Sequence, residues 1–133
     1  MSDVTDKTWD VAMVGAGPTA LAAAVYTTRE DLQTVLFEKG VIGGLASITD
    51  WVDNYPGFPD GIAGLELGES LRKQAERFGT VIELGEVTTI EKQTDYIALQ
   101  TTSGEVKAKT VLIATGSDYK RLGIPGENEY YGR

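Results

Sequence analysis

The chain has 133 residues, which is the size of one domain and too small for separate cofactor and substrate domains. Its 20 acidic residues outnumber its 12 basic residues and give a net charge of −8, which argues against nucleic acid as a partner, because binding a phosphate backbone requires a basic face. The absence of cysteine and histidine excludes a disulfide framework, a thiol nucleophile and the commonest general base, so we expect no catalytic and no metal-ligating residue in this chain.

The N-terminus and the hydropathy pattern give no sign of a membrane or an export signal. Residues 1–7 are polar, and no apolar run approaches the ~18 residues of a membrane span. We therefore expect a cytoplasmic protein without membrane contact. Redox chemistry, if present, would have to come from a bound cofactor.

The first forty residues predict a βαβ unit. Residues 9–14 (WDVAMV) are a short apolar run between a charged stretch and a glycine, which is typical of a buried strand. Residues 18–29 begin with proline at the first helical position and continue with small, helix-forming residues. Residues 34–38 (TVLFE) predict a second buried strand, joined to the first by a right-handed crossover.

The turn between the first strand and the helix matches the dinucleotide fingerprint Gly-x-Gly-x-x-Ala. Its first glycine permits a tight turn, its second lets the backbone approach a pyrophosphate, and its final alanine allows close contact between helix and sheet. Free N–H groups at the helix N-terminus favour phosphate binding. A glycine-rich turn without a ligand is the alternative, and the flanking strand and helix disfavour it. The predicted phosphate-binding residues are Gly15, Ala16, Gly17, Pro18, Thr19 and Ala20.

Glu38 ends the second predicted strand 23 residues after Gly15. An acidic side chain at this place accepts hydrogen bonds from a ribose 2′-hydroxyl, and its charge repels a 2′-phosphate. The site should therefore hold FAD or NAD and reject NADP. The alternative is a solvated glutamate at a strand end.

Residues 39–63 lose all periodicity and predict a long loop. The paired Gly43-Gly44 would let a flat ring lie close to the backbone, and Asn54 offers a donor and an acceptor to the polar edges of a flavin. Two alternatives remain open from the residues alone. The glycine pair could be a simple turn, and Asn54 could form an Asx turn before Tyr55-Pro56.

The second half predicts one helix and a β-meander. Residues 64–78 carry an apolar stripe of Leu67, Leu71, Ala75 and Phe78, and Gly79 ends the helix. Residues 80–92, 96–102 and 105–109 predict short strands, with Ser103-Gly104 as the hairpin turn between the last two. Residues 110–114 (TVLIA) predict a third buried strand.

This order of elements favours FAD over NAD, because an NAD domain would continue directly into another helix and parallel strand. Ala114-Thr115-Gly116, at the end of the third buried strand, points the same way. The predicted fold is a three-layer α/β domain of the FAD-binding, Rossmann-like type. Residues 9–14, 34–38 and 110–114 form its parallel sheet, with helices on one face and the meander on the other.

Four segments together carry a specific resemblance: VGAGPTA, IGGLASITDWVDNYPGF, VLIATGS and LGIPGENEYYGR. They resemble the N-terminal portion of bacterial and archaeal thioredoxin reductases, over nearly the whole chain. The resemblance implies that residues 1–133 are the first segment of an FAD-binding domain. It also implies that the chain of a complete protein continues from Gly132-Arg133 into an NADPH-binding domain with a Cys-x-x-Cys, followed by a C-terminal FAD segment.

The resemblance extends the set of expected cofactor-binding residues beyond the fingerprint. Val87 would meet the adenine through its backbone. Leu45 stands where many members have glutamine, so a backbone contact to the flavin survives there and a side-chain hydrogen bond does not. The additional residues are Glu38, Lys39, Gly43, Gly44, Leu45, Asn54, Val87, Ala114, Thr115 and Gly116.

The function implied by the resemblance is electron transfer from NADPH through FAD to a disulfide, with thioredoxin as the partner and a homodimer as the complete protein. This chain alone would be inactive, because the NADPH site and the cysteines would lie elsewhere. Two alternatives stay open. One is a ferredoxin or flavodoxin reductase of thioredoxin-reductase type, and the other is an FAD-binding module without turnover.

Overall fold

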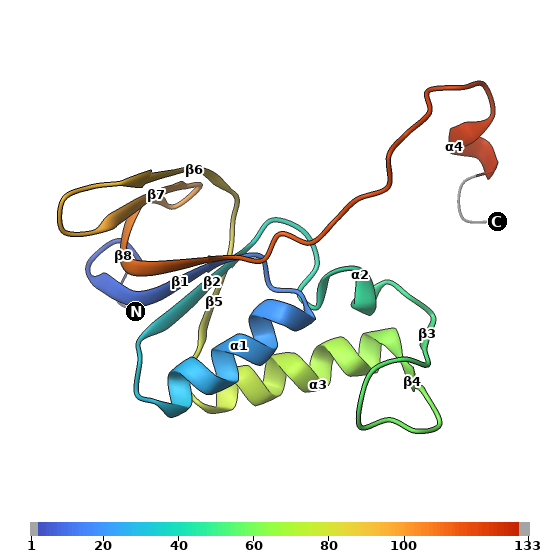
Figure 1. Ribbon diagram of the computed structural model, residues 1–133, viewed down its shortest axis with the longest axis horizontal. Helices are drawn as coiled ribbons and strands as arrows, with labels where there is room; N and C mark the ends of the chain where they lie inside the picture. Colours follow the sequence, from blue (N-terminus) through green and yellow to red (C-terminus); the bar gives the residue numbers. More distant parts are fainter. Residues whose placement is uncertain (1–2, 131–133) are drawn as a thin grey trace.

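A six-stranded sheet organises residues 3–130, the part of the chain that the computed structural model describes (Figure 1). Its strand order is β5-β2-β1-β8-β7-β6, and a separate two-stranded sheet pairs β3 with β4. The strands are β1 (Thr8–Val14), β2 (Thr34–Glu38), β3 (Trp51–Val52), β4 (Ile62–Ala63), β5 (Val81–Leu84), β6 (Val87–Lys92), β7 (Ile97–Thr101) and β8 (Gly104–Ile113). The helices are α1 (Pro18–Arg29), α2 (Gly44–Ser47), α3 (Gly64–Arg77) and α4 (Glu127–Tyr130).

The centre of the sheet is parallel, as predicted. Strand β1 lies between β2 and β8, and β5 adds to the far side of β2. The predicted βαβ unit is confirmed, with α1 between β1 and β2. Asp10 connects β1 to both of its neighbours. Its carboxylate accepts hydrogen bonds from Lys109 Nζ of β8 at 2.7 Å and from the N–H of Gln33, just before β2, at 2.9 Å. The Lys109 ammonium is the main cause that lowers the pKa of Asp10.

Two strand boundaries differ from the prediction. The stretch predicted as one strand, residues 80–92, is two strands that separate at Gly85 and Glu86, and β5 joins the parallel sheet instead of the meander. The two strands predicted at residues 105–109 and 110–114 are one strand, β8. The hairpin turn before it consists of Thr102 and Ser103, since Gly104 already pairs with Thr101.

Strand β8 serves both parts of the sheet. Its first half pairs antiparallel with β7, and the stretch from Lys107 to Ile113 pairs parallel with β1. The hydrophobic pattern of the sequence does not distinguish one long strand from two short ones here, because both halves of β8 contain apolar residues. The strand pairing shows that β8 is a single strand.

The predicted three-layer architecture is confirmed. On one face of the sheet, Val11, Met13 and Leu36 pack with the apolar sides of α1 and α3. On the other face, a second core joins the sheet to the curled meander (Figure 1). This second core contains Trp9, Ala12, Val35, Phe37, Leu99, Val106 and Ala108. From Val11 to Met13, successive side chains of β1 enter opposite cores, as strand geometry requires.

The predicted stripe on α3 is confirmed, with Leu67, Leu71 and Ala75 buried against α1 and the sheet and Phe78 packed beside them. Residues 39–63, in contrast, are not a structureless loop. They contain the short helix α2 and the β3–β4 pair, in which Trp51 lies opposite Ala63. These elements are too short to leave a periodic signal in the sequence.

The chain leaves the body of the molecule after β8 and ends in α4, at a distance from the sheet (Figure 1). Within this segment, Glu127 accepts hydrogen bonds from the N–H groups of Leu122 and Gly123, which lower its pKa. Gly132-Arg133, where the resemblance implies a continuation, lie outside the described residues. Among residues 3–130, no helix is long and apolar enough to cross a membrane.

Candidate functional site

A cleft of about 940 Å³ opens at the carboxyl ends of the parallel strands. In open α/β sheets this is the edge at which ligands bind. The elements around it are the ends of β1, β2 and β8, the start of α1, helix α2 and the turn between β5 and β6. Its lining includes Gly15, Gly17, Pro18, Thr19, Glu38, Lys39, Gly40, Val41, Gly44, Leu45, Gly85, Glu86, Val87, Ala114, Thr115, Gly116, Ser117 and Asp118.

The glycine turn after β1 has two distinct geometries. Gly15 has φ +105°, donates its N–H to the Phe37 carbonyl at 2.8 Å, and has no room for a Cβ, which would collide with the Ala114 carbonyl oxygen. Gly17 has an ordinary φ of −77°, and a Cβ there would meet nothing within 4 Å. Gly15 is therefore required by the packing of β1 against β8, whereas Gly17 leaves space that opens into the cleft.

Helix α1 presents its amino end to this space. Pro18 occupies the first turn, and no side chain caps the helix at Gly17. N–H groups of a first turn have no partner within their own helix, and the positive end of the helix dipole lies beside them. Helix amino ends with such free N–H groups are common binding sites for phosphate and other anions.

Glu38 is fixed at the end of β2 by two backbone groups. Its Oε2 accepts the Ala16 N–H at 2.8 Å, and its Oε1 accepts the Gly40 N–H at 2.8 Å. The side chain is therefore tied to the backbone at the strand end, and its role in ligand binding stays a prediction. Each carboxylate oxygen has a further lone pair, so the side chain still has acceptor capacity for hydroxyl groups of a ligand.

The second glycine turn packs directly on the first. The Gly43 N–H donates to the Ala16 carbonyl at 2.7 Å, and a Cβ at Gly44 would lie 3.3 Å from the Gly17 Cα. Both Gly43 (φ +93°) and Gly44 (φ +59°) have backbone angles that favour glycine. The predicted turn is thus present, and it brings the start of α2 to the edge of the cleft.

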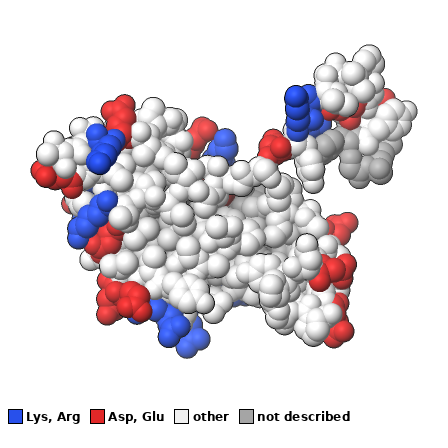
Figure 2. Space-filling model, in the orientation of Figure 1, with Lys and Arg blue, Asp and Glu red and all other residues white. Residues whose placement is uncertain are grey.

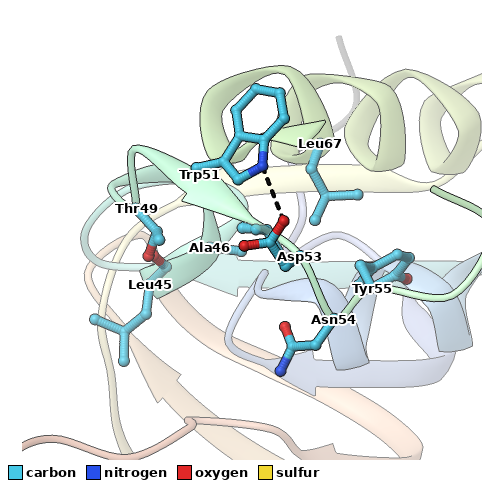
Figure 3. A pocket seen from close by; sticks show the side chains of 9 residues that line it. Leu45, Ala46, Thr49, Trp51, Asp53, Asn54, Tyr55 and Leu67 are labelled. Atoms are coloured by element: carbon cyan, nitrogen blue, oxygen red, sulfur yellow. Dashed lines mark hydrogen bonds between the residues drawn. The ribbon is translucent and has the colours of Figure 1, made fainter. Parts of the chain in front are cut away.

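A smaller pocket of about 590 Å³ lies beyond α2 (Figure 3). Its wall is formed by Trp51, Tyr55 and Leu67 among others, and the Trp51 Nε1–H donates to Asp53 Oδ1 at 3.0 Å. Leu45 and Ala46 line both this pocket and the large cleft. The two cavities are therefore neighbours, separated by α2.

Most of the predicted site residues meet at the large cleft, and four do not line it. Ala16 and Ala20 are fully buried, and Gly43 lies behind the cleft wall. Asn54 lines the smaller pocket, where its amide points away from the Trp51 indole (Figure 3).

Sequence reasoning missed Gly40, Gly85, Glu86, Ser117 and Asp118, which also line the cleft. Of these, only the glycines at strand ends carried a signal. The other positions depend on which strands end beside one another.

Four charged side chains line the cleft: Glu38, Lys39, Glu86 and Asp118. In the space-filling view the centre is almost free of charged side chains, which gather at the margins (Figure 2). Lys39 and Glu86 form an ion pair of 3.3 Å at the cleft, with both side chains largely exposed. Exposed pairs of this kind contribute little stability. Among the described residues, no group of three acidic side chains could hold a metal ion.

Comparison with known proteins relates this chain to a known family. The family model of the pyridine nucleotide-disulphide oxidoreductases matches residues 9–133. The chain is 41% identical to thioredoxin reductase of Bacillus subtilis over 128 residues, and 42% identical to that of Treponema pallidum over 125 residues. These matches cover 96% and 94% of this chain but only 40% and 41% of the two relatives.

A solved structure contains the same fold. Thioredoxin reductase of Lactococcus lactis, in its FR conformation, superposes with a TM-score of 0.85 at 40% identity. The match covers 92% of this chain and 40% of that one. The chain therefore spans about two fifths of the length of the relatives that it matches.

The two glycines of the first turn should respond differently to alanine. Gly15→Ala should destabilise the fold by about 1–3 kcal/mol, because it forces a side chain into a positive φ and against the Ala114 carbonyl. Gly17→Ala should change stability by less than about 0.5 kcal/mol, because its Cβ meets open space. Urea denaturation without ligand measures both. Equal losses in the two variants would contradict this account of the turn.

Proposed function

The chain belongs to the pyridine nucleotide-disulphide oxidoreductase family, and from that premise we propose that it is the FAD-binding portion of a thioredoxin reductase. In the complete protein a bound FAD would carry electrons from NADPH to a disulfide, with thioredoxin as the partner. The observation that carries the proposal is the cleft at the strand ends. Gly17, at the uncapped amino end of α1, lines this cleft and leaves open space there. A homodimer in the cytoplasm is part of the proposal. The homodimer rests on the resemblance to thioredoxin reductases, and the location rests on the polar N-terminus and the hydropathy pattern.

The proposal includes the domain organisation, with residues 1–133 as the first segment of an FAD-binding domain. Support comes from the 40% coverage of the relatives and from the sheet itself. Strand β7 pairs with β8 only as far as Ala108, so among the described residues the stretch from Lys109 to Ile113 has a partner on one side alone. Ile113 is 66% exposed at this open edge. An unpaired strand edge is the place at which a further segment adds.

The residues of the cleft fit FAD. A Cβ at Gly17 would fill the space in front of the α1 amino end, which is the path a pyrophosphate needs. Glu38 is held at the end of β2 with acceptor capacity for ribose hydroxyls. The cleft of about 940 Å³ is large enough for a dinucleotide half, and the smaller pocket beyond α2 adds room for a ring.

The side chains and backbone of this chain bind the cofactor and orient it. The first turn of α1 holds the phosphates, Glu38 accepts the ribose hydroxyls, and the backbone at Val87 lies at the cleft for the adenine. FAD, when bound, supplies the electron transfer, because the chain has no cysteine or histidine of its own. Glu38 also disfavours a 2′-phosphate, so NADPH requires a different site in the complete protein.

The flavin ring is assigned to the boundary between the two cavities. Leu45 and Ala46 form this boundary, and Asn54 offers an amide that makes no hydrogen bond within the described residues. Leu45 presents an apolar side chain that is 50% exposed, which suits contact with a flat ring. Its side chain donates no hydrogen bond, so polar recognition at this place falls to the backbone and to Asn54.

The protein that contains this chain should purify yellow, with FAD at about one per chain. The reason is that the proposed phosphate and ribose positions lie in the large cleft and the proposed ring position lies at its boundary with the smaller pocket. Absorbance spectra with protein quantitation measure the ratio. A colourless protein that ignores added FAD and binds NAD in calorimetry would overturn the cofactor assignment.

Glu38→Gln should weaken FAD binding by about 1.5–3 kcal/mol, the range for a hydrogen bond to a charged group. The matched control is Glu83→Gln on the neighbouring strand β5, which does not line the cleft. Because Glu38 also accepts two backbone N–H groups, unfolding of the FAD-free variants separates loss of fold from loss of binding. Equal FAD affinity in the two variants would remove Glu38 from the site.

The electron acceptor distinguishes the proposed function from its alternatives. The complete protein should oxidise NADPH in the presence of oxidised thioredoxin, while residues 1–133 alone should not, because they contain no cysteine to exchange with a disulfide. Steady-state NADPH oxidation measures both. Turnover with ferredoxin or flavodoxin in place of thioredoxin would replace the proposed acceptor. FAD binding without any turnover would favour a non-catalytic module.

A further inference from the structure

Two glycines of α3, Gly64 and Gly68, lie where α3 meets α2. A Cβ at Gly68 would collide with Ser47 Oγ and lie 3.1 Å from Ser47 Cβ. A Cβ at Gly64 would collide with the carbonyl oxygens of Ala46 and Thr49. The two helices therefore approach at a distance that only glycine permits. Glycine in the interior of a helix is unfavourable by itself, so the close approach is the physical reason for Gly68, while Gly64 opens the helix.

Ser47 is the residue of α2 that fills this contact. It is 9% exposed, and its hydroxyl donates to the Ile42 carbonyl at 3.0 Å. The same hydroxyl occupies the place that a Cβ at Gly43 would need, and that Cβ would also lie 3.0 Å from the Gly68 Cα. Ser47, Gly43 and Gly68 thus form one tightly packed contact without a spare methyl-sized space.

Ser47, Gly43 and Gly68 line neither cavity, but their neighbours in α2 line both. Helix α3 adds only Leu67 to the smaller pocket and no residue to the large cleft. Helix α2, by contrast, places Leu45 and Ala46 on both cavities, and its first residue packs against the Gly17 turn. Any displacement of α2 by α3 would therefore move the wall between the cavities and press on the phosphate turn.

We propose that Gly64 and Gly68 are positioning residues, which set the depth at which α2 lies and thereby the shape of the FAD site. The inference rests on the proposed function, because it concerns affinity for FAD. It assigns no contact between the two glycines and the cofactor. Their effect passes through Ser47 and the carbonyl groups of Ala46 in α2 and of Thr49 just after it.

The test uses the complete protein and FAD itself as the probe. Gly68→Ala should weaken FAD binding by about tenfold or more, because sites of this kind tolerate displacements of only about 0.5 Å. It should also shift the flavin absorbance and fluorescence of the fraction that binds, which a general loss of stability would not do. Lys73→Ala, at an exposed position of the same helix, is the matched control and should leave both unchanged.

Removing the opposing side chain should reverse the effect. In Ser47→Gly/Gly68→Ala the added methyl group finds space, so FAD affinity should return to within about threefold of Ser47→Gly alone, as expected for two residues in direct contact. Such rescue is expected only if the two side chains collide, as the geometry requires.

The outcomes separate the two proposals. A wild-type protein that does not bind FAD overturns the proposed function itself. Wild-type affinity in Gly68→Ala, or no rescue in the double variant, overturns only the positioning role. A Gly68→Ala protein that fails to fold also overturns it, because the contact would then hold the core together instead of adjusting the cleft.

Discussion

The peptide groups of Ala16 hold the two glycine turns and the end of β2 in one place. The Ala16 N–H donates to the Glu38 carboxylate, and its carbonyl accepts the Gly43 N–H. Ala16 itself is fully buried, where an unsatisfied peptide group is costly. Ala16 thus links the end of β2 and the start of α2 to the turn before α1.

This arrangement explains how an acidic chain can present a site for an anionic cofactor. The net charge is −8, and the cleft contains few cations. Backbone N–H groups and the dipole of α1 provide the positive potential instead, and they are fixed by the fold without mobile side chains. Under the proposed function, Glu38 acts locally, as an acceptor for ribose hydroxyl groups, while its bond to Ala16 keeps it at the strand end.

The third layer is needed because the parallel strands are apolar on both faces. Helices α1 and α3 cover one face, and the curled meander covers the other with Leu99 and Val106. Continuity of β8 links the meander to the parallel sheet and ends at the cleft, where Ala114 leads into the C-terminal segment. One strand therefore sets both the second core and one side of the site.

The sequence by itself determined the features that depend on neighbours along the chain. The βαβ unit, the glycine fingerprint, Glu38 at a strand end and the stripe of α3 are local patterns of turn chemistry and periodicity, and the structure contains all of them. The tertiary structure alone decided that residues 80–92 divide between two parts of the sheet, that β8 is continuous, and that Asn54 lies in the smaller pocket beyond α2. It also decided that Gly64 and Gly68 meet Ser47 and its neighbours. These features depend on pairing and contact between segments that are distant in the chain, and a local sequence pattern contains no information about such contacts.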